Sequence, residues 1–346
     1  MVAPANASRR WIQIGIGLFL SAALLYFSFR NISFAELGEQ LTHADYRWLP
    51  VVAALGVYVL YVRSQRWKLL LQQATGRELP MAPIFSANAI GFMANMLLPL
   101  RAGEIARPLL LSARGGIPLA TVLATAVVER ILDLVALVGF AMWMVSVADV
   151  PDEVTAGIWT AGALMIVLTV GLVVVHLQRD RVLPILDRLW KLAPGDFGEK
   201  IIEMEHRFLD DVAAVGDPGV LMRAMLWSVY IWFLIALSFA FGFYVSDIEV
   251  PFFEGGVTVM ALVAFAVAAP AAPGFVGTFE FACKVALEDV YGIAAAKTLG
   301  YTVIMHATTF AVQVVVGLVF LLREGLSLGE IGRMGADEKS ASSPGT

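Results

Sequence analysis

The chain has 346 residues, of which 59% are hydrophobic and only 15% are charged, and its formal net charge is −5. Soluble domains carry about 25% charged residues, whereas a bilayer-spanning helix needs about 20 consecutive apolar residues, which several stretches here supply. The composition excludes a soluble protein and predicts an all-α polytopic membrane protein, a single integral membrane domain over residues 1–346, with no reason to expect a nucleic-acid partner.

The first predicted span covers residues 11–29, directly after Arg9 and Arg10. No small-residue cleavage site follows it, and it is longer than a usual signal-peptide core, so we expect it to be retained. The apolar stretches 154–177, 220–245 and 293–322 are also long enough to cross a bilayer.

The distribution of Lys and Arg predicts the orientation in the membrane. Basic residues gather at both ends of the chain, between the second and third apolar stretches, and in the connection after residue 177. Residues 148–153 and 246–254 contain no Lys or Arg and three acidic residues each. We therefore expect a multi-pass protein of the cytoplasmic (inner) membrane, with these two loops outside and both termini in the cytosol.

Two apolar stretches cannot be plain spans under this orientation. Residues 84–111 begin and end on the cytosolic side, and residues 255–290 begin and end outside. Both are interrupted, by "LLPLRAG" (97–103) and "AAPAAPGFVG" (268–277). Pro removes a backbone donor and Gly frees the backbone, so each stretch predicts a re-entrant hairpin of two half-helices. The residues expected to break the helices are Pro99, Gly103, Pro270, Pro273, Gly274 and Gly277.

The order of these elements predicts an inverted repeat. Residues 11–147 form the first repeat, and residues 154–177 with 220–322 form the second, giving about six full transmembrane helices plus two re-entrant helical hairpins. "GIPLATVLATAV" begins at residue 116 and the similar "GIAAAKTLGYTV" at residue 292 (292 − 116 = 176). Glu104 and Glu280 are separated by the same offset (280 − 104 = 176). Chance similarity between two Ala-rich helices is the alternative.

Two further segments carry no predicted chemistry. Residues 178–219 form a cytosolic connector whose apolar side chains follow one helical face, as in an amphipathic helix at the membrane interface. The polar tail, residues 334–346, is expected to be disordered.

Charged residues inside apolar stretches indicate where a site would lie, because each costs about 2.5–3.5 kcal/mol at the centre of a membrane helix. Glu129, Arg130 and Asp133 fall within one predicted span. Glu129 and Asp133 are four residues apart and share a helical face. They must face protein or a wet cavity, and we expect Arg130 to be the buried counter-charge of one of them. A purely structural Arg–carboxylate pair is the alternative.

Additional arginines give this region a positive surplus. Arg101 and Arg107 interrupt the first hairpin, and Arg63 and Arg66 lie at the cytosolic end of the second span. Helix N-termini add partial positive charge, and the planar donor fork of Arg suits phosphate. The pattern predicts a polar site for an anionic lipid headgroup. For Arg63 and Arg66, simple anchoring at the cytosolic surface is the alternative.

The second hairpin contains fewer charges. Glu280 and Lys284 are one helical turn apart, so an ion pair between them is the simplest expectation for Lys284. Glu280 is of more interest because it repeats Glu104. His306, alone in the last span, is expected to be a satisfied packing residue rather than a proton carrier.

Motifs of several enzyme classes are not found in this sequence. The four His are scattered without zinc-ligand spacing, and there is no Walker loop or nucleophile elbow. We therefore expect a transporter-like protein that is not an enzyme and uses no metal and no cofactor.

Three blocks resemble a known family: "NMLLPLRAGEIARPLLL", then "ATAVVERILDL", then "APGFVGTFEFACKVAL". They are similar to the lysylphosphatidylglycerol synthetase transmembrane-region family, whose members are called flippase-like, and the similarity covers residues 11–322. The resemblance implies an inner-membrane lipid translocator with inverted repeats and re-entrant helices. The residues at its motif positions are Arg66 with Trp67, Arg101, Gly103, Glu104, Arg107, Glu129, Arg130, Asp133, Pro273, Gly274, Gly277 and Glu280.

Full synthetases of that family carry a soluble aminoacyltransferase domain after the membrane part. This chain ends at Thr346, so the resemblance implies no aminoacyl transfer here.

The prediction for function is a lipid flippase or scramblase that moves an anionic, phosphate-bearing lipid, either a phospholipid or a polyprenyl-phosphate-linked lipid. One alternative is a membrane-embedded lipid-modifying enzyme with Glu104, Glu129 or Asp133 as general base. Another is an ion-coupled small-solute transporter of the same architecture. The predicted substrate-binding residues are Arg63, Arg66, Arg101, Glu104, Arg107, Glu129, Arg130, Asp133, Glu280 and Lys284.

Overall fold

The computed structural model describes residues 25–26, 34–98, 101–160, 162–163, 167, 217–268 and 272–327. All regular secondary structure in these ranges is helical, which confirms the all-α prediction. Within them, Tyr46–Thr75, Pro218–Val245 and Ala295–Arg323 are helical, long and apolar enough to cross a membrane. The chain is therefore a multi-pass membrane protein.

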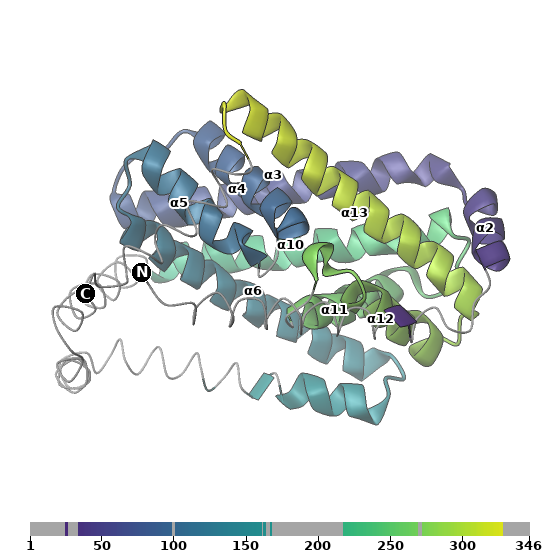
Figure 1. The fold of residues 1–346 in the computed structure, drawn as a ribbon. Coiled ribbons are helices and arrows are strands. Elements are labelled where there is room, and N and C mark those ends of the chain that lie inside the picture. The colour runs from purple at the N-terminus through teal and green to yellow at the C-terminus, as the bar shows by residue number, and fades with distance from the viewer. Residues whose placement is uncertain are drawn as a thin grey trace, which may run out of the picture.

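The described helices form an elongated bundle (Figure 1). Residues 152–160 are also helical. The elements are α2 (Phe34–His43), η1 (Tyr46–Trp48), α3 (Leu49–Thr75), α4 (Met81–Leu97), α5 (Gly103–Gly115), α6 (Leu119–Val147), α10 (Pro218–Val245), α11 (Phe252–Ala268), η3 (Pro273–Phe275), α12 (Thr278–Lys284), η4 (Val285–Val290) and α13 (Ala295–Arg323). In Figure 1, α4 and α5 lie toward one end of the bundle, α11 and α12 toward the other, and α13 runs along both.

Helices α4 and α5 form an antiparallel hairpin. Asn95 near the end of α4 contacts Glu104 at the start of α5, whereas Asn88, two turns earlier, contacts Arg107. A Cβ on Gly103 would lie 1.9 Å from the carbonyl oxygen of Gly91, so only glycine allows this approach. Helix α5, the second arm of the hairpin, begins at Gly103.

A second antiparallel hairpin is formed by α11 and the α12–η4 segment. The hydroxyl of Tyr291, just after η4, donates to Glu254 at the start of α11, with a distance of 3.1 Å. Between the two arms, Gly274 has a φ of 71° and Gly277 a φ of 91°, values that glycine adopts readily. The backbone therefore reverses at two of the predicted glycines, and Pro273 begins the short η3 turn there.

The helix lengths of the first half recur in the second. Helices α4 and α11 both have 17 residues, and α6 and α13 both have 29. The 13 residues of α5 correspond to the seven of α12 followed directly by the six of η4. Left-handed glycines precede α6 and α13, Gly116 with φ 59° and Gly292 with φ 67°.

Several predicted features lie outside the described residues. These are Pro99, Pro270, nearly all of the first span (11–29), most of 154–177, the connector (178–219) except its last three residues, and the tail (334–346).

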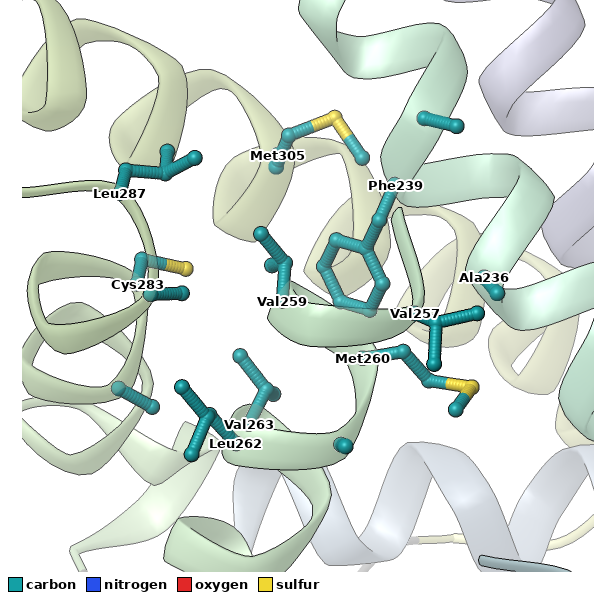
Figure 2. Close-up of a cluster of buried hydrophobic side chains, with 14 of the residues drawn as sticks. Ala236, Phe239, Val257, Val259, Met260, Leu262, Val263, Cys283, Leu287 and Met305 are labelled. Atoms are coloured by element: carbon teal, nitrogen blue, oxygen red, sulfur yellow. The ribbon is translucent and has the colours of Figure 1, made fainter. Parts of the chain in front are cut away.

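The apolar core of the second half is formed by α10 to α13 with the nearby part of α6 (Figure 2). Small residues bring these helices together: a Cβ on Gly256 would lie 2.5 Å from the carbonyl oxygen of Ala236, and one on Gly242 would lie 2.5 Å from the sulfur of Met305. Such close contact is the main attraction available between helices in lipid. A second core, which includes Trp67 and Ile90, lies around α4 and α5.

Candidate functional site

Arg66 is the centre of a buried polar cluster between α3, α6 and α10. Its side chain is 0% exposed. It donates to Glu129 at 3.1 Å, to both carboxylate oxygens of Asp133, and to the hydroxyl of Ser228 at 2.7 Å. One guanidinium therefore bridges two carboxylates, Glu129 and Asp133, which lie on the same face of α6 as their four-residue spacing predicts.

Arg107 of α5 completes the pairing of Glu129. It donates to the second carboxylate oxygen of Glu129 at 2.7 Å and to the amide oxygen of Asn88 at 2.9 Å. Its guanidinium also lies over the ring of Trp67, 4.3 Å from the centroid, a favourable cation–π position. Glu129 is held between two arginines and is 0% exposed, so no bound molecule can reach it without displacing one of them.

Several partners in this cluster were not predicted from the sequence. Asn88 of α4, Ser64 of α3 and Ser228 of α10 are all buried and hydrogen-bonded to the cluster or to each other. Thr125 accepts a hydrogen bond from the indole of Trp67 at 3.1 Å. An isolated polar residue within an apolar helix was the available signal, because such groups must be paired inside a membrane.

Arg130 pairs with Asp133 of its own helix, but it is not a buried counter-charge. Its side chain is 44% exposed, and it lies 3.3 Å from Asp133 and 3.8 Å from Glu104. The buried counter-charge of Glu129 and Asp133 is Arg66, which belongs to a different helix. Residues three apart on one helix can pair at its surface, but only a neighbouring helix can enclose the pair.

Arg63 differs from the other arginines because it is only partly engaged. Its guanidinium donates one long hydrogen bond, 3.3 Å, to Asp133 and lies 5.4 Å from the ring centroid of Phe92. The Nε atoms of Arg66, Arg101 and Arg107 are buried without a partner, whereas Arg63 has no such atom. The side chain of Arg63 is 10% exposed, and its remaining donors are not fully buried.

Arg63 faces a cavity of about 150 Å³ between α3, α4, α10 and α13. Apolar side chains form most of its wall, among them Leu60, Phe92 and Ile235, and Gln313 contributes an amide. A cavity with an apolar wall and a guanidinium at one margin suits an amphipathic molecule. Its apolar part would pack against the wall, and its anionic group would bind the guanidinium.

Arg101 and Glu104 lie beside the cluster at the start of α5. Arg101 donates to the carbonyl oxygen of Val267 in the other hairpin at 2.6 Å. Glu104 accepts from the amide of Asn95 at 3.3 Å and lies 3.8 Å from Arg130. Counting every charge that the sequence assigned to this region, five arginines face three carboxylates, which leaves a surplus of two positive charges (5 − 3 = 2). The region therefore favours an anion.

Glu280 and Lys284 do not form the expected ion pair. Lys284 lies 3.1 Å from Glu288, one turn further along, and 3.4 Å from Asp289. Glu280 instead pairs with His306 of α13 at 2.7 Å, away from the Arg66 cluster. The structure thus joins seven of the predicted residues in one region, with Arg101 at its edge, and separates Glu280 and Lys284 from it.

Residues 13–317 match the family described as the lysylphosphatidylglycerol synthase TM region, a span that includes both hairpins and the whole polar cluster. The chain belongs to this family. Membership in the lysylphosphatidylglycerol synthase TM-region family relates the chain to membrane-lipid metabolism. The chain is also similar to a glycosyltransferase named AglD from Haloferax volcanii, with 25% identity over an alignment of 353 positions that covers 92% of this chain. The matched part is 55% of that relative, so the chain spans about half of its length. No solved structure matches the chain.

Proposed function

We propose that this protein is a flippase or scramblase that moves a phosphate-bearing lipid between the two leaflets of the cytoplasmic membrane. The observation that carries the proposal is the position of Arg63, whose unpaired donors are not fully buried, at the margin of an apolar cavity of about 150 Å³. In this view the phosphate binds Arg63 and the adjoining hydrocarbon lies against Leu60, Phe92 and Ile235.

The rest of the cluster prepares Arg63 for this task. Asp133 also pairs with Arg66 and with Arg130, so its 3.3 Å contact with Arg63 is readily exchanged for a phosphate oxygen. Arg66 and Arg107 stay in place because each spans two or more partners from different helices. A rigid cationic frame with one partly engaged guanidinium binds an anion without collapsing when the anion leaves.

The arrangement of the helices supports movement across the membrane. Under the proposal the α4–α5 hairpin is re-entrant from the cytosolic side and the α11–α12 hairpin from the outside, with both chain termini in the cytosol. The recurring helix lengths then reflect an inverted repeat of about six spans and two hairpins. Two halves of opposite orientation can exchange conformations, which gives a central site access to each side in turn.

The name of the curated relative favours a second candidate, a lipid-modifying enzyme such as a glycosyl-transferring protein. Glu129 and Asp133 are poor general bases in this arrangement, because both are held by arginines. Glu104, whose side chain is 34% exposed, is the carboxylate that remains for such a role. The mostly apolar wall of the cavity is less suited to the third candidate, a transporter of small polar solutes.

The proposal is tested by reconstituting the protein into liposomes and following a fluorescent phosphatidylglycerol into the opposite leaflet. Arg63→Ala should lower the rate about tenfold or more, since a hydrogen bond to a charged group contributes about 1.5–3 kcal/mol. Arg223→Ala, an exposed arginine of α10 that donates to the carbonyl of Gly219, is the matched control. An unchanged rate in Arg63→Ala would remove this cavity from the path, and formation of a new glycolipid that requires Glu104 would favour the enzyme.

A further inference from the structure

Glu280 and His306 together hold the reversal between α11 and α12. The Nδ1 atom of His306 lies 2.7 Å from Glu280 Oε1, and its Nε2 atom lies 2.7 Å from the carbonyl oxygen of Gly274. The other carboxylate oxygen of Glu280 accepts from the backbone N–H of Gly277 at 2.6 Å. The pair therefore connects α13 to both glycines at which the backbone of this hairpin reverses.

The hydrogen bonds of this pair require one proton more than an ionised glutamate beside a neutral histidine can supply. A carbonyl oxygen only accepts, so Nε2 of His306 must carry a proton to bond Gly274. A second proton must lie between Nδ1 and Glu280, because two lone pairs would otherwise face each other at 2.7 Å. The closed arrangement is thus either an imidazolium with a carboxylate or an imidazole with a protonated carboxyl.

Loss of that proton breaks one of the two bonds to His306. A neutral imidazole has a single N–H, which can satisfy Gly274 or Glu280 but not both. Whichever partner is left faces a lone pair and is repelled. No covalent bond other than that to the proton forms or breaks, and the proton passes to water. Deprotonation therefore releases the α11–α12 reversal from α13.

The equivalent pair in the first half cannot respond in this way. Glu104 precedes Glu280 by 176 residues (280 − 104 = 176), and Arg130 precedes His306 by the same number (306 − 130 = 176). Arg130 lies 3.8 Å from Glu104, so each half pairs the glutamate of its hairpin with a base on its last helix. Arginine keeps its proton under all physiological conditions, whereas histidine exchanges its own. Only the second hairpin has a titratable pair.

Water can reach this proton, and no other charged side chain of α12 pairs with Glu280 or His306. The side chains of His306 and Glu280 are 11% and 8% exposed, which gives water limited access. On α12, Cys283 is buried and is not in a disulfide. Lys284 is turned to Glu288 and Asp289.

The other elements against the pair contribute one fixed charge and mostly apolar surface. At η3, the guanidinium of Arg101 lies 5.3 Å from the ring centroid of Phe275. Tyr301 of α13 donates to the carbonyl of Phe239 on α10. The ring of Phe279 stacks on His306 with centroids 4.4 Å apart.

We propose that the Glu280–His306 pair is a proton-binding site that couples the movement of the α11–α12 hairpin, and with it lipid transport, to uptake and release of one proton. The coupling to lipid rests on the proposed function, whereas proton binding and hairpin release do not. Protonation fastens the hairpin to α13, and deprotonation frees it.

The first experiment measures the hairpin without any lipid transport. Spin labels are placed on the exposed residues Val276 and Leu322, each replaced by Cys in a Cys283→Ser background, and their separation is recorded by pulsed electron resonance across the histidine pH range. As pH rises, a second distance between the two spin labels should appear, from molecules in which the hairpin is released from α13. His306→Arg, which reproduces the fixed charge of the first half, should stay in the low-pH distance at every pH. His43→Gln, on an exposed residue of α2, is the control and should behave like the parent.

A second variant and a transport assay keep the two proposals distinguishable. Glu280→Gln should also lose the pH response, and it preserves the size of the side chain. In liposomes with an imposed pH gradient, the lipid flux of the parent should follow the gradient and that of His306→Arg should not. A pH-dependent distance without lipid flux would leave the proton site standing and refute the transport proposal. Lipid flux with distances that ignore pH in the parent would overturn the proton site and leave the transport proposal standing.

Discussion

Arg101, at the reversal of the first hairpin, donates a 2.6 Å hydrogen bond to the main-chain carbonyl oxygen of Val267, at the end of α11 in the second. Its guanidinium also lies beside Phe275, and both residues have positive φ angles, 50° and 59°. Residues other than glycine adopt such φ angles at a cost of about 1–3 kcal/mol. Arg101 therefore connects the reversal of the first hairpin to that of the second.

The first prediction concerns this connection. Arg101→Ala removes the hydrogen bond to Val267, so both reversals should open more often. Amide deuterium exchange should rise in peptides that cover 272–277 as well as in those around residue 101. Arg101→Lys retains a cationic donor group without the planar fork and should restore part of the protection. An increase confined to the first hairpin would contradict a connection between the two.

The second prediction separates Arg66 from Arg130, both of which pair with Asp133. Arg66→Leu should destabilise the protein by about 3–5 kcal/mol, because it leaves buried carboxylates without their shared partner. Arg130→Leu should cost clearly less, since Arg130 is 44% exposed and Asp133 keeps Arg66. Thermal melts in detergent measure both. An equal or larger loss of stability in Arg130→Leu would indicate that Arg130, and not Arg66, is the main counter-charge of the buried carboxylates.

The third prediction concerns the contact between α4 and α5. Gly103→Ala places a Cβ 1.9 Å from the carbonyl oxygen of Gly91, so the hairpin must separate and its melting temperature should fall. Gly139→Ala is the matched control, because a Cβ there meets nothing within 4 Å and alanine favours the helix by about 1 kcal/mol. Similar melting temperatures for the two variants would show that the close approach is not required.

The charged residues of the site could be predicted because each is costly in a membrane and must serve a purpose. Their partners could not. Arg130 and Arg66 were equally able to neutralise Glu129 on the basis of charge alone, and only the packing of α3 on α6 decides between them. Helical periodicity likewise predicted an ion pair between Glu280 and Lys284, whereas in the structure Glu280 pairs with His306 on another helix.

Main-chain partners are also outside the reach of sequence reasoning. Nothing in the side-chain pattern indicates that Arg101 meets the carbonyl of Val267, or that His306 meets that of Gly274. The breaks themselves were predictable, because Gly274 and Gly277 adopt angles that other residues reach only at a cost. Backbone flexibility can thus be read from residue type, but the groups that the freed backbone contacts cannot.

The central claim is that a phosphate-bearing lipid occupies the cavity beside Arg63, and photo-crosslinking from the cavity wall tests it most directly. A benzophenone amino acid replaces Phe92, which lines the cavity, or Phe85, a control on the same helix that packs on Phe320 instead. The protein is irradiated in vesicles of phosphatidylglycerol and diacylglycerol, and adducts are identified by mass. We predict a phosphatidylglycerol adduct at position 92 that is lost with Arg63→Ala and does not form at position 85. Equal capture of diacylglycerol, or an adduct that persists without Arg63, would contradict the claim.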